Sequence, residues 1–368
     1  MEKVLIKDKE KFLIITPYFY PFYKFGGAAV TISNLYFAMK DQLNLTVLSN
    51  SWSSEIQSSN SVKYLNSPIQ VLAYIKKNHH KYKSIYLNSF FSPSWSILPY
   101  TFLKVIGFKG DIIFFPRGEL KKNALTFKST KKSIYLSFFK KILNSRSNTF
   151  IVSDELEAED LKRIFPKNSS VIVPDFLPPY QKPINQSDKT NKFNLVFISH
   201  LRESKNLMFV LKLLKKLPED FYLTIYGNAD DPSYFNKCMD FINQNEMKHR
   251  IHLKGLISHD KIIDTFAYHN FFIFPTKTEN FGYVILESML GGCIPVISKH
   301  TPWSEMDHFP GLSLDLDLQT WSNNLLELVD NPKKIKEIQS RCKNFANNFV
   351  ATSTSKDKFL AHIYDRQL

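Results

Sequence analysis

Residues that would build a metal site or a disulfide framework are scarce in this chain of 368 residues. Its three cysteines are an odd number, widely spaced and all in the second half, which favours neither a disulfide framework nor a zinc site. No Asp-x-Asp pair stands between strand-like runs, because residues 230–231 indicate a turn and residues 315–317 precede a predicted helix. The sequence therefore predicts a protein that binds no metal ion.

A membrane-spanning segment is also missing. A helical span needs about 18 apolar residues without charges, and the nearest stretch, residues 84–103, is broken by Asn88, Pro93 and Pro99. Residues 1–11 alternate charge with single apolar residues, so they lack the apolar core of a signal peptide. We therefore expect a cytoplasmic protein, and we expect any membrane contact to be peripheral, on the inner face of the plasma membrane.

What the chain does contain is enough apolar surface for a large folded protein. Its residues are 43% apolar, 14% aromatic and 22% charged, and 32 of them are Phe. This composition excludes a chain that stays disordered for want of apolar surface. The length suits two domains of ordinary size, each with its own core.

Positive charge is concentrated in the first half of the chain. Residues 1–180 hold 25 Lys and Arg against 13 Asp and Glu, whereas residues 181–368 hold 23 against 21. The excess is sharpest in a basic patch between residues 120 and 153, where no acidic residue stands. Such a patch predicts a surface for phosphate-bearing partners, either anionic lipid or nucleic acid, with a solvated helix face as the alternative. The basic patch consists of Lys121, Lys122, Lys128, Lys131, Lys132, Lys140, Lys141 and Arg146.

Short β-branched or aromatic runs alternate with amphipathic stretches, which predicts parallel sheets covered by helices on both faces. A proline-rich polar linker, residues 177–193, separates two such series. We therefore predict an α/β fold with two doubly wound, Rossmann-like domains, residues 1–176 and 194–351, facing each other across a cleft that holds the active site. The expected strands are 12–16, 45–49, 84–88, 111–115, 149–153 and 171–174, then 194–199, 222–226, 250–253, 271–274 and 294–298.

The most specific chemistry lies in residues 274–298. A predicted strand ends at the start of this segment, a polar loop carries Glu279, and Gly282 opens a helix. Glu287 lies about 7–8 Å further along the axis of that helix. Helix amides at 280–282 favour an anion or a hydroxyl-rich ligand. Two carboxylates at this separation suit different hydroxyl groups of one extended ligand, and the alternative is a pair of solvated glutamates.

The same segment resembles the donor-site signature of the retaining glycosyltransferases of the large group 1 family, which have two Rossmann-like domains (GT-B type). The pattern there is Pro-Thr/Ser, a short loop, Glu-x-Phe-Gly, four residues, Glu, and later Pro-Val-Ile. By this resemblance Glu279 and the amides of Asn280, Phe281 and Gly282 would hold hydroxyls of the donor sugar. Glu287 would hold the ribose hydroxyls of the nucleotide.

Residues 197–207 are similar to the family's first strand and loop of the donor domain, where an Arg and a Lys neutralise the leaving diphosphate. Lys205 matches the family's lysine, and we expect it to be the main phosphate ligand. His200 stands where the arginine is expected. An imidazole cannot form two parallel hydrogen bonds to a phosphate as a guanidinium does. Three alternatives therefore stay open: His200 substitutes for the arginine, Arg202 reaches the phosphate instead, or the arginine's function is weakened.

Two elements of the first half also match the family. Gly26 and Gly27 follow the first strand and precede a helix, where the family keeps a glycine loop beside the donor phosphate and the acceptor. Residues 115–120 resemble a Pro-Arg-Gly-x-Leu element of one branch, which implies that Arg117 points into the cleft and acts in catalysis. The alternatives are an ordinary turn at the glycine pair and a structural arginine at 117.

Further strand ends and a helix cap complete the resemblance. Gly227 and Leu256 fall where the family's donor pocket lies, the second near the nucleotide base. Asp154 and Glu157 have the spacing of a capping box, which we interpret as structural. The chain from residue 332 is predicted to be helical with a break near 351–355, and the resemblance implies that residues 352–368 pack back on the first domain.

The resemblance implies the transfer of a hexose-type sugar from a nucleoside diphosphate sugar, of UDP or GDP type, to an acceptor hydroxyl with the anomeric configuration kept. No cofactor or metal is expected. The first domain would serve the acceptor, a lipid-linked saccharide of a bacterial surface polysaccharide, and the second the donor; an anionic membrane surface is an expected partner and nucleic acid is not. The alternatives are a nucleotide-sugar epimerase of the same fold, or a non-catalytic basic protein that binds membranes or nucleic acid.

Overall fold

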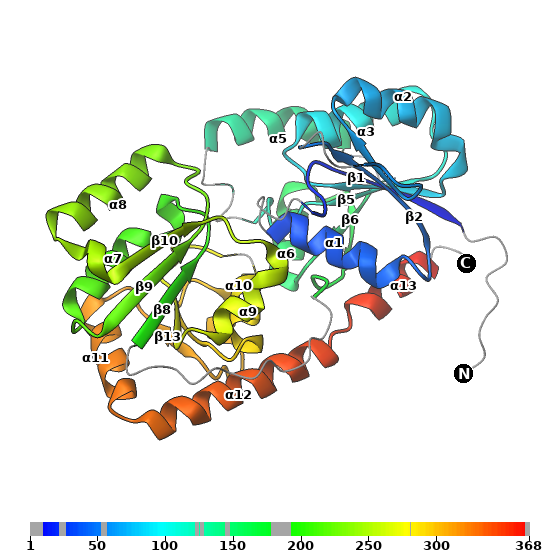
Figure 1. Ribbon diagram of the computed structural model, residues 1–368. Coiled ribbons are helices and arrows are strands. Elements are labelled where there is room, and N and C mark those ends of the chain that lie inside the picture. The colour runs from blue at the N-terminus through cyan, green and yellow to red at the C-terminus, as the bar shows by residue number, and fades with distance from the viewer. Residues whose placement is uncertain are drawn as a thin grey trace. The chain divides into compact units, whose positions relative to one another are not determined.

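The computed structural model describes residues 10–21, 27–52, 57–121, 125, 129–143, 148–177, 193–279 and 281–364. The chain divides into two compact units (Figure 1). Unit 1 consists of Met1–Pro178 together with Ser353–Leu368, and unit 2 of Pro179–Thr352. The expected linker, residues 177–193, lies almost entirely outside the described residues.

Unit 1 is built on a seven-stranded parallel sheet in the order β3-β2-β1-β4-β5-β6-β7. Side chains alternate between the two faces of each strand. On β1, Leu13 and Ile15 enter one apolar core, whereas Phe12 and Ile14 enter a second core. The strands are β1 (Lys11–Thr16), β2 (Asn44–Asn50), β3 (Val62–Leu65), β4 (Ser84–Asn88), β5 (Asp111–Phe115), β6 (Asn148–Val152) and β7 (Ser169–Ile172).

Helices cover both faces of this sheet (Figure 1). One core takes residues from α2, α3, α5 and α6, and the other takes residues from α1 and from α13, at the end of the chain. Phe359 and Ile363 are the buried residues that α13 contributes. The helices are α1 (Gly27–Met39), α2 (Pro68–Asn78), α3 (Leu98–Val105), α5 (Ser129–Leu143), α6 (Glu155–Ile164) and α13 (Ser355–Tyr364).

Unit 2 has a six-stranded parallel sheet in the order β10-β9-β8-β11-β12-β13. Its central strands are continuous apolar runs because helices cover both faces. The strands are β8 (Phe193–Ile198), β9 (Phe221–Tyr226), β10 (Ile251–Gly255), β11 (Phe271–Phe274), β12 (Ile294–Ser298) and β13 (Leu312–Leu314). The helices are α7 (Leu207–Lys216), α8 (Pro232–Gln244), α9 (Ile262–Ala267), α10 (Tyr283–Leu290), α11 (Leu318–Val329) and α12 (Pro332–Ala351).

The α/β prediction of two doubly wound sheets is confirmed, with a few local differences. β3 and β13 were not predicted, because each is a strand of four residues or fewer at a sheet edge. β7 begins two residues before the predicted range. The sequence pattern also predicts one helix over 204–217. The structure divides this stretch at Asn206, whose left-handed φ of 62° separates a 3-10 turn from α7. The expected break in the last helical stretch occurs at residues 352–354.

None of the helices in the described part of the chain combines the length and the apolar character that a membrane span requires.

Candidate active site

In unit 2, most of the predicted donor-site residues lie on two loops that follow β8 and β11. These two strands are neighbours in the parallel sheet, so their carboxyl ends bring the loops side by side. Hydrogen bonds join the loops directly: the Thr276 hydroxyl donates to the Ser204 carbonyl at 3.1 Å, and the Lys277 amide donates to the same carbonyl at 2.8 Å. The Ser298 hydroxyl, at the end of β12, donates to the Thr276 carbonyl. The loops therefore have a fixed mutual geometry.

Lys205 and Glu279 meet across these loops. The Lys205 ammonium Nζ lies 2.7 Å from Glu279 Oε2 and 3.4 Å from the Thr278 carbonyl oxygen. It also lies 5.5 Å from the centroid of the Phe274 ring. Only 9% of the Lys205 side chain is exposed, so bulk water does little to screen this ion pair. A buried cation is thus neutralised by a carboxylate that has an exposed fraction of 17%.

Asn206 and Gly282 turn the chain at the ends of the two loops. Asn206 has φ 62° and Gly282 has φ 81°, both in the left-handed region that favours Asn and Gly. A Cβ added to Gly282 would lie 3.0 Å from Glu279 Cγ, so the absence of a side chain leaves room for this glutamate. The Gly282 carbonyl accepts the first α10 hydrogen bond, from Ile285. The amides at the start of α10 have no acceptor within the helix and can face a ligand.

Phe281 is held by an aromatic cluster, and Asn280 lies outside the described residues. The Phe281 ring centroid lies 4.8 Å from that of Tyr283 and 5.2 Å from that of Trp303. The Trp303 indole N–H donates to the Phe281 carbonyl. The backbone just before Gly282 is therefore fixed by side-chain packing rather than by a helical hydrogen bond.

Glu287 lies on α10 with only 3% of its side chain exposed. Its Oε1 atom has no hydrogen-bond partner among the described residues, and the nearest basic group, His259 Nδ1, is 3.6 Å away. Burial raises the pKa of the Glu287 carboxyl to about 8. An unsatisfied buried polar group destabilises a fold, and such groups cluster at functional sites. His259, which follows β10, was not predicted as a site residue because no motif surrounds it.

His200 has a specific carboxylate partner that the sequence did not indicate. Its Nδ1 forms an ion-pair contact with Asp230. Burial lowers the pKa of His200, and the nearby positive charges of Arg202 and Lys205 lower it further, whereas Asp230 raises it. Arg202 is exposed just before the 3-10 turn that carries Lys205. The structure thus brings three basic side chains into one electrostatic neighbourhood.

Gly227 and Leu256 lie at the ends of β9 and β10. Gly227 has φ 151°, and a Cβ there would lie 1.9 Å from the Ser199 carbonyl oxygen, so no other residue fits without a shift of the backbone. Its amide donates to the Gly255 carbonyl at 2.8 Å. Leu256 is 56% exposed immediately after β10. An exposed leucine at a strand end is available for contact with a ligand.

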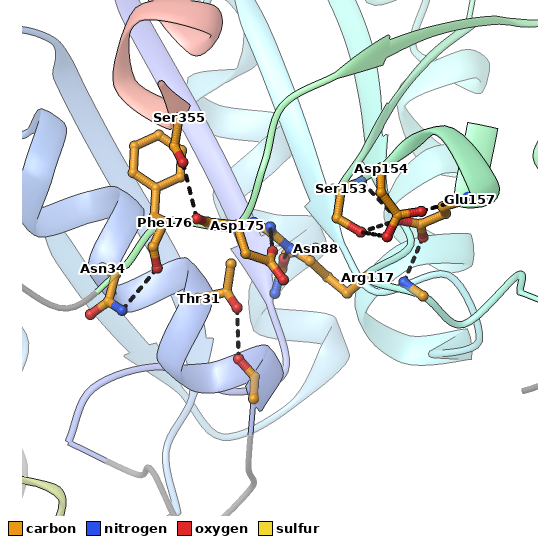
Figure 2. Close-up of polar contacts among 12 residues, drawn as sticks. Thr31, Asn34, Asn88, Arg117, Ser153, Asp154, Glu157, Asp175, Phe176 and Ser355 are labelled. Atoms are coloured by element: carbon orange, nitrogen blue, oxygen red, sulfur yellow. Dashed lines mark hydrogen bonds and ion pairs between the residues drawn. The ribbon is translucent and has the colours of Figure 1, made fainter. Parts of the chain in front are cut away.

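In unit 1, Arg117 lies in a tight turn after β5, as Figure 2 shows. Its Nε donates to Asn88 Oδ1 at 3.0 Å and its Nη1 to Asp175 Oδ1 at 2.9 Å. The guanidinium carbon lies 4.3 Å from the centroid of the Phe115 ring. The Arg117 side chain is 8% exposed, and its Nη2 has no hydrogen-bond partner among the described residues. Neither Asn88 nor Asp175 was expected at this site.

Two glutamates hold the turn that carries Arg117. Glu157, a buried residue of α6, accepts hydrogen bonds from the Gly118 amide and from the Ser153 amide and hydroxyl (Figure 2). The Glu157 amide donates to Asp154 Oδ1 at 2.8 Å, which confirms Asp154 as the helix cap. Glu119 accepts from the Ser89 hydroxyl at 2.9 Å and from the Phe91 amide at 2.9 Å. The left-handed φ of Arg117, 52°, is therefore sustained from both sides.

The remaining predicted residues of unit 1 are only partly described. Gly26 lies outside the described residues, and Gly27 is the exposed first residue of α1. Lys121 pairs with Asp154 at 2.7 Å, and Lys140 is exposed on α5. Lys122, Lys128 and Arg146 lie outside the described residues, as do the side chains of Lys131, Lys132 and Lys141.

Comparisons with known proteins give a family match for most of unit 2 and a fold for the whole chain. Residues 181–345 match the family model described as "Glycosyl transferases group 1". A search of curated protein sequences finds no match to the chain. Among solved structures, sucrose-phosphate synthase from Thermosynechococcus elongatus is similar, with 13% identity, a TM-score of 0.78 and coverage of 97% of this chain and 100% of that one.

Two further structures have the same fold. HepE from Anabaena, in complex with UDP and glucose, is 15% identical, with a TM-score of 0.73 and coverage of 97% of this chain and 100% of that one. WaaG, a glycosyltransferase involved in lipopolysaccharide biosynthesis, is 11% identical, with a TM-score of 0.63 and coverage of 96% and 99%. Most of unit 2 thus matches the group 1 glycosyltransferase model, and the chain as a whole shares the GT-B fold of these solved structures.

Proposed function

We propose that the chain is a retaining, metal-independent glycosyltransferase that moves a hexose-type sugar from a nucleoside diphosphate sugar to a hydroxyl of a lipid-linked saccharide, in the synthesis of a bacterial surface polysaccharide. The observation that carries this proposal is the buried Lys205–Glu279 ion pair just before α10. Further along that helix lies the buried Glu287 carboxyl, whose Oε1 atom has no hydrogen-bond partner among the described residues. A cation, a row of helix amides and two carboxyl groups match a charged diphosphate joined to two hydroxyl-rich rings.

Donor binding exchanges the partners of the Lys205–Glu279 pair. The ammonium of Lys205 turns from Glu279 to the diphosphate, where it neutralises the charge that develops as the phosphate leaves. Glu279 is thereby released to accept hydroxyl groups of the donor sugar, and Glu287 accepts the ribose hydroxyls. The leaving phosphate takes the proton of the acceptor hydroxyl on the same face of the sugar, which keeps the anomeric configuration.

A uridine nucleotide is the first donor to test. HepE structures contain UDP and UDP-glucose as ligands, and a structure of S. aureus TarM also contains UDP. Lipid-linked acceptors fit the excess of basic residues in the first half of the chain. WaaG takes part in lipopolysaccharide biosynthesis, and WaaB is a galactosyltransferase of the lipopolysaccharide outer core.

The decisive experiment is a thermal-shift screen with UDP-, GDP-, ADP- and CMP-sugars, because a ligand bound only by the folded state raises the melting temperature. We expect one nucleotide class to stabilise the native chain, and Glu287→Gln and Glu279→Ala each to reduce that shift. Glu305→Gln, which changes an exposed carboxylate elsewhere in unit 2, is the control. If no nucleotide sugar shifts the melting temperature, the proposal fails.

Product analysis with the stabilising donor then separates the alternatives. A transferase forms a new glycoside only when an acceptor is present, and it keeps its activity in EDTA. An epimerase converts the nucleotide sugar without an acceptor. A non-catalytic binding protein does neither. For the basic patch, binding to anionic vesicles is compared with that of a variant in which Lys121, Lys122, Lys131 and Lys132 are neutralised.

A further inference from the structure

An aromatic surface lies beyond the carboxyl ends of β1 and β2 in unit 1. Tyr18 is two residues past the end of β1, and Trp52 is two residues past the end of β2. Their rings are stacked, with centroids 5.8 Å apart and an angle of 22° between the ring planes. Trp52 is 41% exposed, so a broad part of its indole faces solvent. We call these two rings the Trp52 platform.

The backbone holds the Trp52 platform in place. The Trp52 indole N–H donates to the Pro17 carbonyl at 3.1 Å. The Thr16 hydroxyl donates to the Tyr18 carbonyl at 2.8 Å. An exposed tryptophan that is fixed in one orientation loses little side-chain entropy when a ligand covers it, which favours recognition. The surface is therefore preorganised before any ligand arrives.

The platform is joined to Arg117 by an unbroken series of hydrogen bonds. Arg117 Nε donates to Asn88 Oδ1, and Asn88 Nδ2 donates to Thr16 Oγ1, each at 3.0 Å. Thr16 in turn contacts Tyr18. The series follows the adjacent strands β5, β4, β1 and β2, whose carboxyl ends lie on one edge of the sheet. The series anchors the platform to the interior of unit 1, because Thr16 and Asn88 are 0% and 2% exposed.

We propose that the Trp52 platform is a binding subsite for a pyranose ring of the acceptor saccharide. The C–H groups on the apolar face of the ring stack on the exposed part of the indole. Aromatic rings gain energy from such face contacts. This subsite rests on the proposed glycosyl transfer, since it identifies the acceptor as a saccharide with an accessible pyranose face.

The platform fits a sugar better than a lipid bilayer. Tryptophans that anchor proteins in membrane interfaces use an apolar body and keep their N–H for the headgroup region. The N–H of Trp52 already donates to the Pro17 carbonyl, and Tyr18 covers part of the indole. What stays accessible is aromatic ring surface held in one orientation, which suits the apolar face of a sugar ring.

Fluorescence can test the subsite without a known acceptor. The chain has four tryptophans, and Trp95, Trp303 and Trp321 are 6%, 0% and 0% exposed, so quenching by neutral acrylamide reports mainly on Trp52. The probes are the methyl α- and β-pyranosides of glucose, galactose, mannose and N-acetylglucosamine. Sorbitol, which has hydroxyls but no ring face, is the matched control ligand. Vesicles of phosphatidylglycerol and phosphatidylcholine form the lipid arm.

We expect at least one pyranoside to lower the quenching of the native chain toward that of Trp52→Phe, and sorbitol to have no effect. Protection by vesicles and by none of the pyranosides would overturn the proposal in favour of a membrane surface. Quenching that no probe changes would overturn it as well. Because these readings need no nucleotide, they separate a wrong subsite from a wrong proposed function.

A kinetic arm uses the transferase assay once a donor is known. Trp52→Ala should raise the KM for the acceptor about tenfold, with the KM for the donor unchanged, and Trp52→Phe should restore much of the loss. Tyr268→Ala removes another exposed aromatic ring, 60% exposed in unit 2, and should change neither constant. A loss of kcat with no change in the acceptor KM would contradict an acceptor subsite.

Discussion

Each of the two units contains a buried basic side chain that is paired with a carboxylate. Each holds a basic side chain at the carboxyl ends of its strands, and in each a carboxylate already neutralises it: Lys205 with Glu279 at 2.7 Å, and Arg117 with Asp175 at 2.9 Å. The first half of the chain nevertheless carries a large excess of positive charge and the second almost none. The net charge of each half of the chain therefore does not determine the electrostatic potential at Lys205 or Arg117. The carboxylate beside each side chain determines it.

The two ion pairs differ in where the carboxylate residue lies in the chain. Glu279 stands in a loop that also carries the family's motif, directly before α10. Asp175 follows β7, and its carbonyl accepts a hydrogen bond from Ser355 at the start of α13 (Figure 2). The lysine pair thus belongs to two loops that can exchange partners with a ligand, whereas the arginine pair is built into the packing of unit 1. We expect the first pair to control catalysis and the second to control stability as well.

The largest effect should come from the lysine pair. Lys205→Ala removes the cation that faces the leaving diphosphate, and we expect kcat to fall about 10²–10³-fold. Lys277→Ala, in the neighbouring loop after β11, is the matched control: its ion pair with Glu203 has side chains 48% and 69% exposed, and exposed pairs contribute little. Steady-state kinetics with a nucleotide sugar compare the two. Equal losses in both variants would contradict a specific role for Lys205.

The arginine pair should affect folding strongly. Arg117→Ala leaves the largely buried Asp175 without its cation, and we expect the free energy of unfolding to fall by about 3 kcal/mol in urea titrations. Adding Asp175→Asn should recover part of the loss, since it removes the unpaired charge. Arg163→Ala breaks a surface pair with an arginine side chain 67% exposed and should change stability little. A destabilisation of unit 2 rather than unit 1 would argue against this interpretation.

The Glu287 carboxyl should make the stability of unit 2 depend on pH. Its pKa of about 8 in the folded chain lies above the ordinary value of 4.5, so the folded state binds more protons between these two values. Stability is therefore full below about pH 4.5 and falls as the pH rises to about 8. Glu287→Gln should remove this decline and melt higher than the native chain at about pH 8.5, by roughly 2–4 °C for each kcal/mol regained. Parallel melting curves at all pH values would show that Glu287 does not titrate in this range.

The pH dependence of donor affinity is a second test of the ionisation of Glu287. Ribose hydroxyls that donate to Glu287 favour its ionised form, so the affinity for a nucleotide sugar should rise from about pH 6 to about pH 8. Binding titrations across this range measure the slope, which should vanish in Glu287→Gln.

The smallest expected effect is that of Gly282→Ala, which distinguishes backbone strain from a steric contact with Glu279. Gly282→Ala places a Cβ at φ 81° and 3.0 Å from Glu279 Cγ, whereas Gly107→Ala in unit 1 has φ 66° and no atom within 4 Å of the new Cβ. Both should lose about 1–2 kcal/mol of stability, since both are in the left-handed region. Only Gly282→Ala should raise the KM for the donor, because only it displaces Glu279. An unchanged donor KM in Gly282→Ala would separate Glu279 from the donor.

Much of the fold follows from local sequence, because the central strands are short continuous apolar runs. The ranges 84–88, 111–115, 271–274 and 294–298 were predicted to the residue. The edge strands β3 and β13 were not, since they are short and half-buried and give no clear apolar run. The interruption at Asn206 was not predicted either, because nothing in the helical pattern over 204–217 indicates it.

For the candidate site, motifs predict the residues, and only the folded chain reveals their partners. Lys205, Glu279 and Gly282 were predicted, and the structure brings them together. Asp230 and His259 were missed because their contacts, with His200 and with Glu287, join elements that are far apart in the sequence. Asn88 meets the Arg117 turn only because β4 pairs with β5 so that Asn88 lies beside Phe115. Such juxtapositions depend on sheet register, which motif spacing does not contain.

The position of α13 at the end of the chain determines which unit can complete its fold first during translation. Phe359 and Ile363 complete a core whose other members come from the first 176 residues of the chain. Unit 2, by contrast, is made of one continuous stretch that ends at Thr352. Because chains emerge from their amino terminus at about 5–20 residues per second, unit 2 has all its residues before unit 1 does. Unit 1 begins to be synthesised first, but its core is completed last, when α13 is made. Until then the sheet face that α13 packs on has exposed apolar surface, which a chaperone can protect.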